Sequence, residues 1–368
     1  MKIPLCRASI GEEELNAVKE VLMAENPWLT HGPKNKEFEE SFSRYVKVKH
    51  ALSVNSCASA LLVALEANNL KGEVILPSFT HMASANAVVK AGCKPVFVDI
   101  NEDTFNIEPE EVRKAVNKNT VAILVVHFAG QCCEMDKIIE IAKKNNLKII
   151  EDCAENIGGS FNGKMAGSFG IGCFSFFPTK NMTTGEGGMI TSDDDEFFEK
   201  AKLLSAHGTV KNPEKNWYRD CILPGYNFRM SNINAAIGLE QLKKLEEMNK
   251  KRGEHAEYLN KNLNIEGVEK PFVDKRCKHA YQMYIIKVDE KIRDGLVDFL
   301  RKEGVETSVQ FDPPVHMQGG YNQFKVNLPV TEKVCKSVVT LPMFPGLKKE
   351  ELEFIIEKLE EGIKNLKP

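Results

Sequence analysis

The sequence predicts an α/β protein in which a large domain, with a mostly parallel sheet covered by helices, precedes a smaller C-terminal α+β domain. In the first two hundred residues, short β-branched runs alternate with stretches of helical pattern, as is typical of parallel sheets. Runs such as VAILVV are apolar at every position, which strands buried on both faces require. The 368 residues, 42% of them hydrophobic, allow a large core and about two domains.

The predicted elements of the first half follow one another in order. The expected strands are HALSV, GEVILP, KPVFVD, VAILVVHF and LKIIEDC. Between them we expect helices that begin near Ala58, run from about Ala83 to Lys90, and run from about Met135 to Lys144.

A long helix is predicted from Ser231, a residue type that caps helix N-termini, and it could bridge two domains. After it come the strand-like HAYQMYIIKV, a helix near Arg293 to Glu303 and a final helix from Lys348. We place the domain boundary near residue 245, which gives a large domain of residues 1–245 and a small domain of residues 246–368.

Composition and charge exclude several classes of protein. The net charge of -3 and the pI of about 6.3 predict no binding to nucleic acid or to an anionic membrane. The N-terminus lacks a signal-peptide pattern, and no apolar run reaches the roughly 18 residues of a membrane span, so we expect a cytosolic protein. The ten cysteines form no C-x-x-C pair, and buried, reduced thiols are expected even for adjacent Cys132 and Cys133.

Other patterns favour no metal or nucleotide site. No zinc signature or G-x-x-x-x-G-K-[ST] loop occurs, and GSFGIG lacks dinucleotide-loop spacing. The acidic run from Asp193 to Asp195 predicts a helix start rather than a metal site. His127 is interpreted as structural or ring-adjacent, with a catalytic base as the alternative, and His207 either contacts substrate or ends a helix.

Polar residues directly after apolar strands are where parallel sheets bind ligands. Asp152 follows the strand of LKIIEDC, where a carboxylate could pair with a protonated ring nitrogen or cap the next helix. Lys180 follows an aromatic, apolar run in FSFFPTKNMTTGEGG, and a lysine facing an apolar pocket readily loses its proton and can form an imine with an aldehyde. Ser175 would offer a hydroxyl to a phosphate.

A third place is LSVNSCASALLVAL, where a strand runs into a helix through small residues. Free N–H groups at a helix N-terminus, together with the helix dipole, attract anions, although many helices begin this way without binding a phosphate.

Four motifs in order, VNSCASAL, EDCAEN, FSFFPTKNMTTGEGG and YNFRMSNINAAIGLEQL, resemble those of the DegT-type sugar aminotransferase family, a branch of fold type I pyridoxal phosphate enzymes. The resemblance runs from PWLTHGP to VVTLPMFPGLKKEEL, which is nearly the whole chain. It implies a fold type I aminotransferase-like architecture, pyridoxal 5'-phosphate as cofactor and a homodimer with shared active sites.

The resemblance also implies a role for each matching residue. Lys180 would bind the cofactor aldehyde and shuttle the proton, and Asp152 would be the partner of the pyridinium ring. The other implied cofactor contacts are Cys57, Ala58 and Ser175 at the phosphate, His81 on the ring, Glu155 at the phenolic oxygen, and Asn227 reaching the phosphate from the neighbouring subunit. The implied substrate contacts are Arg229 and His316, and Thr30 lies in the PWLTHGP loop expected to set specificity.

Three of these positions depart from the family pattern. Glu155 stands where many relatives have glutamine, so we expect an altered pKa or a different contact. Ala58 replaces a common threonine and removes a hydroxyl from the phosphate site. His81 replaces a ring that is usually a larger aromatic, and imidazole can titrate near neutral pH.

The expected reaction moves an amino group from an amino acid, with L-glutamate as the expected donor, to a nucleotide-linked keto sugar for polysaccharide or glycan amino-sugar synthesis. Relatives with histidine in place of the lysine resemble dehydratases, so Lys180 favours amino transfer. The alternatives are a non-catalytic regulatory protein of the same fold, and a transaminase or dehydratase acting on an inosose or another keto sugar.

Overall fold

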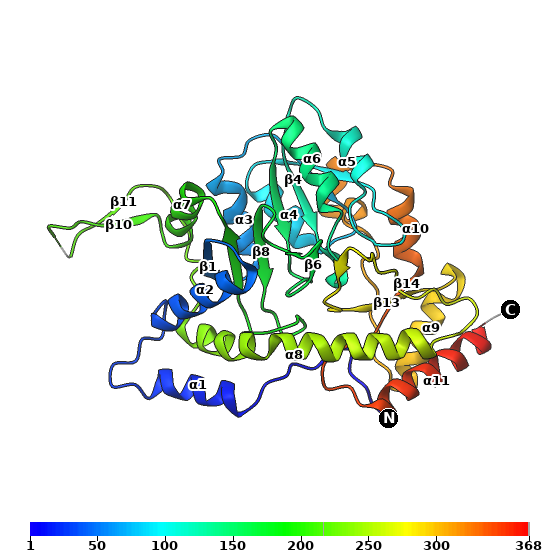
Figure 1. Cartoon of the computed structure of the whole chain (residues 1–368). Coiled ribbons are helices and arrows are strands. Elements are labelled where there is room, and N and C mark those ends of the chain that lie inside the picture. Colours follow the sequence, from blue (N-terminus) through cyan, green and yellow to red (C-terminus); the bar gives the residue numbers. More distant parts are fainter. Residues whose placement is uncertain (216, 367–368) are drawn as a thin grey trace.

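The computed structural model describes residues 1–215 and 217–366, and a seven-stranded sheet lies at its centre (Figure 1). The strands lie in the order β1-β9-β8-β5-β4-β2-β3. β9 is antiparallel to both neighbours and the other neighbouring pairs are parallel, which confirms the predicted mostly parallel sheet. Its strands are β1 (His50–Val54), β2 (Glu73–Pro77), β3 (Lys94–Val98), β4 (Thr120–Val126), β5 (Lys148–Asp152), β8 (Ile171–Ser175) and β9 (Gly188–Ser192).

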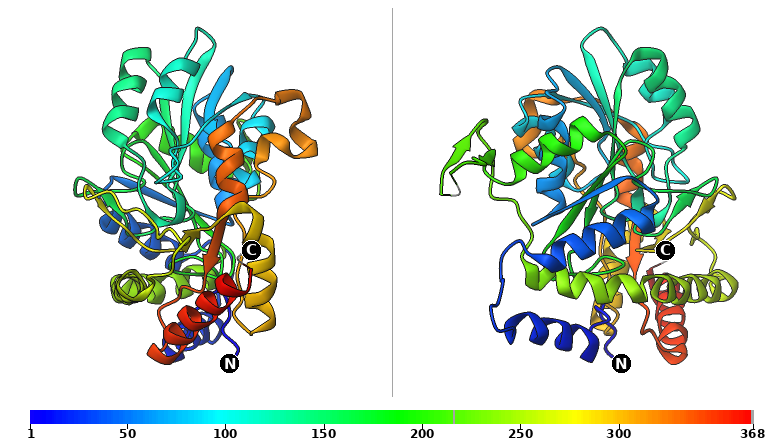
Figure 2. Two further views of the ribbon diagram at one scale, coloured as in Figure 1. Left: turned by 90° about the vertical axis from the view of Figure 1, so that its right-hand side faces the viewer. Right: turned by 60° about the vertical axis from the view of Figure 1, so that its left-hand side comes forward.

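Helices cover both faces of this sheet, so this part of the molecule has three layers (Figure 2). One face carries α3 (Cys57–Ala67), α4 (Met82–Lys90) and α7 (Asp195–Ser205), and the other carries α2 (Pro33–Val46), α5 (Pro109–Ala115), α6 (Met135–Asn145) and the first half of α8 (Asn232–Asn262).

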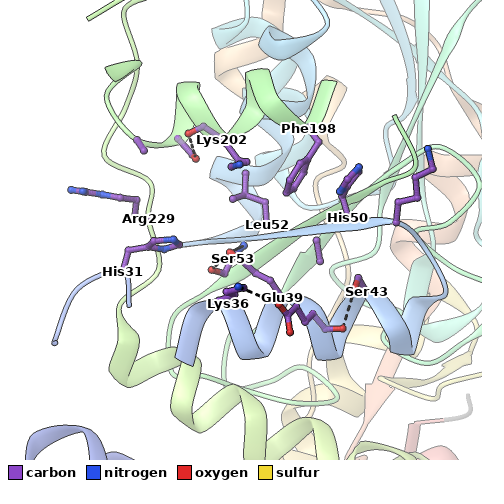
Figure 3. Close-up of a pocket in the computed structure, with 15 residues that line it drawn as sticks. His31, Lys36, Glu39, Ser43, His50, Leu52, Ser53, Phe198, Lys202 and Arg229 are labelled. Atoms are coloured by element: carbon purple, nitrogen blue, oxygen red, sulfur yellow. Dashed lines mark hydrogen bonds and ion pairs between the residues drawn. The ribbon is translucent and has the colours of Figure 1, made fainter. Parts of the chain in front are cut away.

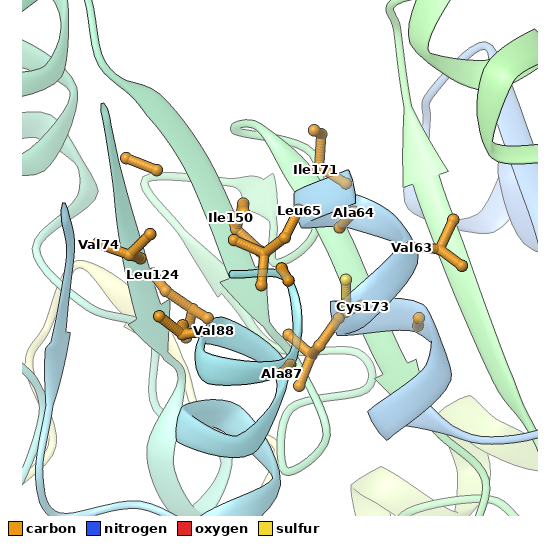
Figure 4. Packing of buried hydrophobic residues seen from close by; sticks show 14 of the residues in the cluster. Val63, Ala64, Leu65, Val74, Ala87, Val88, Leu124, Ile150, Ile171 and Cys173 are labelled. Atoms are coloured by element: carbon orange, nitrogen blue, oxygen red, sulfur yellow. The ribbon is translucent and has the colours of Figure 1, made fainter. Parts of the chain in front are cut away.

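The strands read as apolar runs because both of their faces are buried. Leu124 of β4 packs with Ile150, Leu65 and Val88 between the sheet and α3 and α4 (Figure 4). Its neighbour Ile123 points the other way, into the opposite core. Burying each such side chain contributes about 2 kcal/mol.

The predicted long helix is α8, which has 31 residues. The Ser231 hydroxyl accepts a hydrogen bond from the Asn234 N–H at 3.1 Å, which confirms Ser231 as its N-cap. Met248 packs in a core of the large sheet, whereas Ala256 packs in a separate C-terminal core. The predicted boundary at residue 245 thus falls inside α8, and the domain division stays a prediction.

The C-terminal core lies between the end of α8 and a two-stranded antiparallel sheet. The N-terminal residue Ile3 also packs there. Not every residue after 246 joins this core, because Val315 and Tyr321 pack back against the face of the large sheet that carries α3. The elements of this part are β13 (Tyr284–Lys287), α9 (Glu290–Lys302), η2 (Val315–Met317), η3 (Gly319–Phe324), α10 (Pro329–Ser337), β14 (Val338–Leu341) and α11 (Lys349–Leu366).

The remaining elements lie at the periphery. α1 (Glu12–Leu22) runs beside α8, and the hairpin of β10 (Thr209–Lys211) and β11 (Arg219–Cys221) projects away from the body (Figure 1). A small sheet joins β6 (Ser160–Phe161), β7 (Lys164–Met165) and β12 (Cys277–Lys278), and η1 (Phe128–Gly130) follows β4. Among the helices of residues 1–215 and 217–366, none is long and apolar enough to cross a membrane.

Candidate active site

A cavity of about 400 Å³ lies at the carboxyl ends of β5 and β8. This is the edge of a parallel sheet at which ligands bind. Seven of the predicted site residues line it, namely Cys57, Ala58, His81, Asp152, Glu155, Ser175 and Lys180. The structure therefore brings together residues that lie up to 123 positions apart in the sequence.

Asp152 is the last residue of β5 and only 5% exposed. Its Oδ2 accepts a hydrogen bond from the Ser84 hydroxyl at 2.7 Å, and its Oδ1 accepts one from the Ala154 N–H at 3.0 Å. Both oxygens are therefore held, and the carboxylate faces the cavity as a fixed group that can pair with a cation. It starts no helix, so the capping role that we considered for it does not apply.

Lys180 and Glu155 face each other across the cavity. Lys180 Nζ lies 3.8 Å from Glu155 Oε1, while Glu155 Oε2 accepts a hydrogen bond from the Ala129 N–H at 3.1 Å. Burial raises the pKa of Glu155, and the opposite charge of Lys180 and the Ala129 bond partly offset that rise. The altered pKa expected for Glu155 is therefore an increase, and its main cause is burial.

The N-terminus of α3 forms another wall. The hydroxyl of its N-cap, Ser56, accepts from the Ser59 N–H at 3.2 Å, and the first amides of a helix have no acceptor inside the helix. β9 approaches so closely that a Cβ on Gly188 would lie 2.8 Å from the Cys57 nitrogen, so glycine is needed there. With the Ser175 hydroxyl nearby in the lining, this wall suits an anion.

His81 lies at the rim of the cavity as the N-cap of α4. Its Nδ1 accepts a hydrogen bond from the Ala83 N–H at 3.2 Å. The bond fixes the ring beside Phe311, with ring centroids 6.5 Å apart. An aromatic wall is therefore present where the family resemblance implies a ring.

Four predicted site residues do not reach this cavity within one chain. Thr30 is exposed, and its carbonyl accepts from the Asn232 N–H at 2.9 Å. His316 is only 2% exposed, and its ring is bonded to Ser78 at 2.7 Å and lies 3.3 Å from Glu332. Within one chain His316 therefore does not lie at the mouth of the cavity, where we expected it, because Ser78 and Glu332 hold its ring inside the protein.

Asn227 and Arg229 also lie elsewhere, on the surface. The Asn227 Oδ1 accepts two hydrogen bonds from the Arg229 guanidinium, at 2.9 and 3.1 Å, and Arg229 also lies 3.3 Å from His207. Arg229 lines a second cavity of about 500 Å³ between α2, β1 and α7, which we call the edge cavity (Figure 3). Burial, with Arg229 nearby, lowers the pKa of His31 at the same end.

Sequence reasoning missed several groups at the first cavity. Ser84, which fixes Asp152, lies three residues after His81, one turn along α4, and that spacing could have indicated it. Gln310 and Phe311 line the cavity from the C-terminal part of the chain, and no sequence signal places them there.

His127, Glu151 and Cys153 form a buried group that could in principle hold a metal ion. His127 Nδ1 accepts from the Cys133 N–H at 3.1 Å, so its Nε2 donates to Glu151 at 3.0 Å. Glu151 also accepts three backbone N–H groups, at 2.7 to 2.8 Å, from residues 167–170. These bonds occupy both carboxylate oxygens, so the group fits an anchor for that loop and supports the structural interpretation of His127.

The acidic run from Asp193 to Asp195 and His207 lie at the two ends of α7. Asp194 caps α7 by accepting from the Phe197 N–H at 3.0 Å, so the acidic run does open a helix. His207 lies just beyond the end of α7 with a positive φ of 66° and contacts Arg229.

Comparison with known proteins shows the family to which the chain belongs. The sequence profile of the DegT/DnrJ/EryC1/StrS aminotransferase family matches residues 8–360. The spore coat polysaccharide biosynthesis protein SpsC of Bacillus subtilis is 38% identical over 98% of this chain and 97% of its own.

Solved structures of aminotransferases superpose closely on this chain. PseC of Helicobacter pylori, an aminotransferase involved in the biosynthesis of pseudoaminic acid, superposes with a TM-score of 0.94 at 28% identity, covering 99% of this chain and 100% of its own. The PLP-form of the putative sugar aminotransferase Spr1654 of Streptococcus pneumoniae has a TM-score of 0.94 at 26% identity, covering 100% of both chains. This chain therefore belongs to the DegT/DnrJ/EryC1/StrS aminotransferase family and is an aminotransferase with the fold type I architecture.

Proposed function

We propose that the enzyme uses pyridoxal 5'-phosphate to move an amino group from an amino acid, with L-glutamate as the expected donor, to a keto sugar carried on a nucleotide. The observation that carries this proposal is the meeting of Lys180, Asp152 and the N-terminus of α3 in one cavity. The roles of SpsC in spore coat polysaccharide biosynthesis and of PseC in pseudoaminic acid biosynthesis support a sugar acceptor, with surface polysaccharide or glycan synthesis as the purpose. The PLP-form of Spr1654 supports the cofactor.

The donor set of the cavity fits this cofactor. A phosphate needs N–H and O–H donors, and the α3 N-terminus with Ser175 offers both. A protonated ring nitrogen needs a fixed carboxylate, and Asp152 is held by Ser84. An aldehyde needs an amine, and Lys180 supplies one that is only 15% exposed.

The residues of the chain then have distinct tasks. When bound, pyridoxal phosphate supplies an aldehyde that takes up the amino group and a ring that withdraws electrons from the carbon that loses its proton. Lys180 Nζ takes that proton and returns it to the other carbon. Asp152 keeps a positive charge on the ring nitrogen favourable. Glu155, when it carries its proton, can donate a hydrogen bond into the cavity.

Labelling and product analysis test the proposal together. Borohydride treatment of protein incubated with pyridoxal phosphate should fix the cofactor on Lys180, as peptide mass analysis would reveal. A panel of keto sugar nucleotides and inososes, each with glutamate as donor, should yield an aminated sugar nucleotide. Amination of inososes alone would replace the sugar-nucleotide acceptor, whereas no label on Lys180 would refute the cofactor.

We also propose a homodimer in which Asn227 and Arg229 complete the active site of the partner. Within one chain they lie on the surface and outside the Lys180 cavity. Mass measurement in solution tests the dimer, and a monomer with full activity would refute it.

A further inference from the structure

We propose that residues 280–283, here called the brace, position Lys180 for the reaction, and that Gln282 is the main positioning residue. The inference rests on the function proposed for Lys180. It adds a contribution from a segment that lies about one hundred residues away in the sequence and outside the lining of the cavity.

The brace holds the chain on both sides of Lys180. Gln282 Nε2 donates to the Thr179 carbonyl at 3.0 Å, and the Ala280 carbonyl accepts from Asn181 Nδ2 at 2.9 Å. Gln282 is 7% exposed and Asn181 is 2% exposed. Because water has little access to these bonds, neither is easily replaced, and both neighbours of the lysine are fixed.

The same segment also holds the opposite wall of the cavity. The Ala280 N–H donates to the Gly130 carbonyl at 2.8 Å, and the Met283 N–H donates to the Ala129 carbonyl at 3.3 Å. The Ala129 N–H in turn holds Glu155. The brace therefore links the backbone next to Lys180 with the backbone that orients Glu155.

The contact with η1 is close enough to constrain the sequence. Gly130 has φ of 106°, and a Cβ there would lie 2.6 Å from the Tyr281 nitrogen. Tyr281 itself has φ of 43°, a left-handed conformation that is rare for a bulky residue and persists only where surrounding contacts determine it.

Two side chains of α8 hold the brace and Asn181 in place. Asn249 Oδ1 accepts from Asn181 Nδ2 at 2.7 Å, and Arg252 donates to the Gln282 carbonyl at 3.4 Å and to the Met343 carbonyl at 2.8 Å. Asn249 and Arg252 are both buried. The brace thus has a rigid support.

A brace is needed because of where Lys180 lies. The segment that follows Asn181, MTTGEGG, is rich in glycine, and the lysine amine sits on a flexible chain of four carbons. A displacement of about 1 Å at a reacting group can cost a hundredfold in rate. We therefore expect the loss of the Gln282 bond to leave the fold in place while moving the amine out of position.

The test compares two buried glutamines in protein stripped of cofactor. Gln282→Met keeps the length of the side chain and removes the donor to Thr179. Gln131→Met is the matched control, because Gln131 is 2% exposed, donates to the Phe272 carbonyl at 3.3 Å and accepts from the Asp274 N–H at 2.7 Å, outside the cavity lining. For each protein we would measure the rate at which borohydride traps pyridoxal phosphate on Lys180, and the thermal unfolding midpoint.

The expected result is trapping at the wild-type rate in Gln131→Met and trapping slowed by about tenfold or more in Gln282→Met, with similar falls in the unfolding midpoint. If Gln282→Met does not fold, Gln282→Asn replaces it, since its amide is one methylene too short to reach Thr179. A wild-type trapping rate in a folded Gln282 variant, or equal slowing in the control, overturns the inference. Wild-type protein that traps nothing on Lys180 instead overturns the proposed function.

Discussion

The cavity around Lys180 and the edge cavity around Arg229 are built differently. In the first, Asp152 and Glu155 are buried and accept hydrogen bonds from neighbouring groups. In the second, Arg229 and its partners Asn227 and His207 are all exposed. Burial raises the pKa of Glu39 in the edge cavity, where Ser53 donates two hydrogen bonds to it, so that acid belongs to the packing of α2 against β1.

The difference indicates which groups one chain completes by itself. Strand ends of a single sheet bring the amine, the acid and the anion-binding wall together. The groups near the edge cavity remain open to a second chain, and we expect them to act there. Substitutions in the Lys180 cavity and near the edge cavity should therefore have different effects.

The largest effect is expected from Lys180→Ala. The variant lacks the amine that we propose as the general base, so kcat should fall by a thousandfold or more, on the order expected for the loss of an acid–base group. Steady-state rates and borohydride labelling measure this change. The exposed Lys211→Ala serves as the control and should retain both activity and label; retained transfer in Lys180→Ala would exclude Lys180 as the base.

The second largest effect is expected from Asp152→Asn, which should lower kcat by about a hundredfold. The amide can still accept from Ser84, so the change removes charge with little change of shape. The comparison variant Ser84→Ala keeps the charge but loses one of its supports, and a smaller loss is expected. Equal kcat in Asp152→Asn and the wild type would show that the ring nitrogen needs no anion here.

Subunit complementation tests the edge region directly. Lys180→Ala and Asn227→Ala are each expected to be weakly active, but a hybrid dimer would contain one intact site, so an equal mixture should recover about a quarter of wild-type activity. Lys180→Ala mixed with Asp152→Asn is the control, because both residues belong to the cavity of one chain and no hybrid site is intact. Recovery in the control, or none in the first mixture, would refute shared sites.

The smallest expected effect is a change in the pH dependence of the free energy of unfolding when Glu155 is replaced. Burial raises its pKa in the folded protein above the ordinary 4.5, so the stability that this acid contributes is fully present below about pH 4.5 and is lost as pH rises through the folded-state pKa. Glu155→Gln does not titrate, and it can still accept from Ala129. The variant should therefore become more stable relative to the wild type as pH rises.

Urea unfolding of the cofactor-free proteins from about pH 4 to pH 8 checks this difference. The exposed Glu25→Gln gives the control, and its difference from the wild type should stay flat. A flat difference for Glu155→Gln would mean that Glu155 folds with an unshifted pKa.

Much of the fold could be predicted because local pattern and burial agree along the chain. α6 begins at the predicted Met135, β5 begins at the second residue of the expected strand LKIIEDC, and α11 begins one residue after the predicted Lys348. The strand expected over HAYQMYIIKV is shorter, however, since β13 begins only at Tyr284. The residues before it are held by hydrogen bonds to η1 and to the Lys180 loop, and those contacts override strand propensity. The cytosolic location stays a prediction.

The sequence by itself determined the parallel sheet and the placement of Asp152 and Lys180 after buried strands, because a strand buried on both faces must be apolar and must end where polar residues begin. Only the tertiary structure decided that Phe311 lines the cavity, that Gln282 bonds to the Lys180 loop, and that Arg229 lies outside the cavity. These contacts join segments far apart in the chain, and the packing of α8 and the C-terminal core, rather than any local pattern, fixes the distances between them.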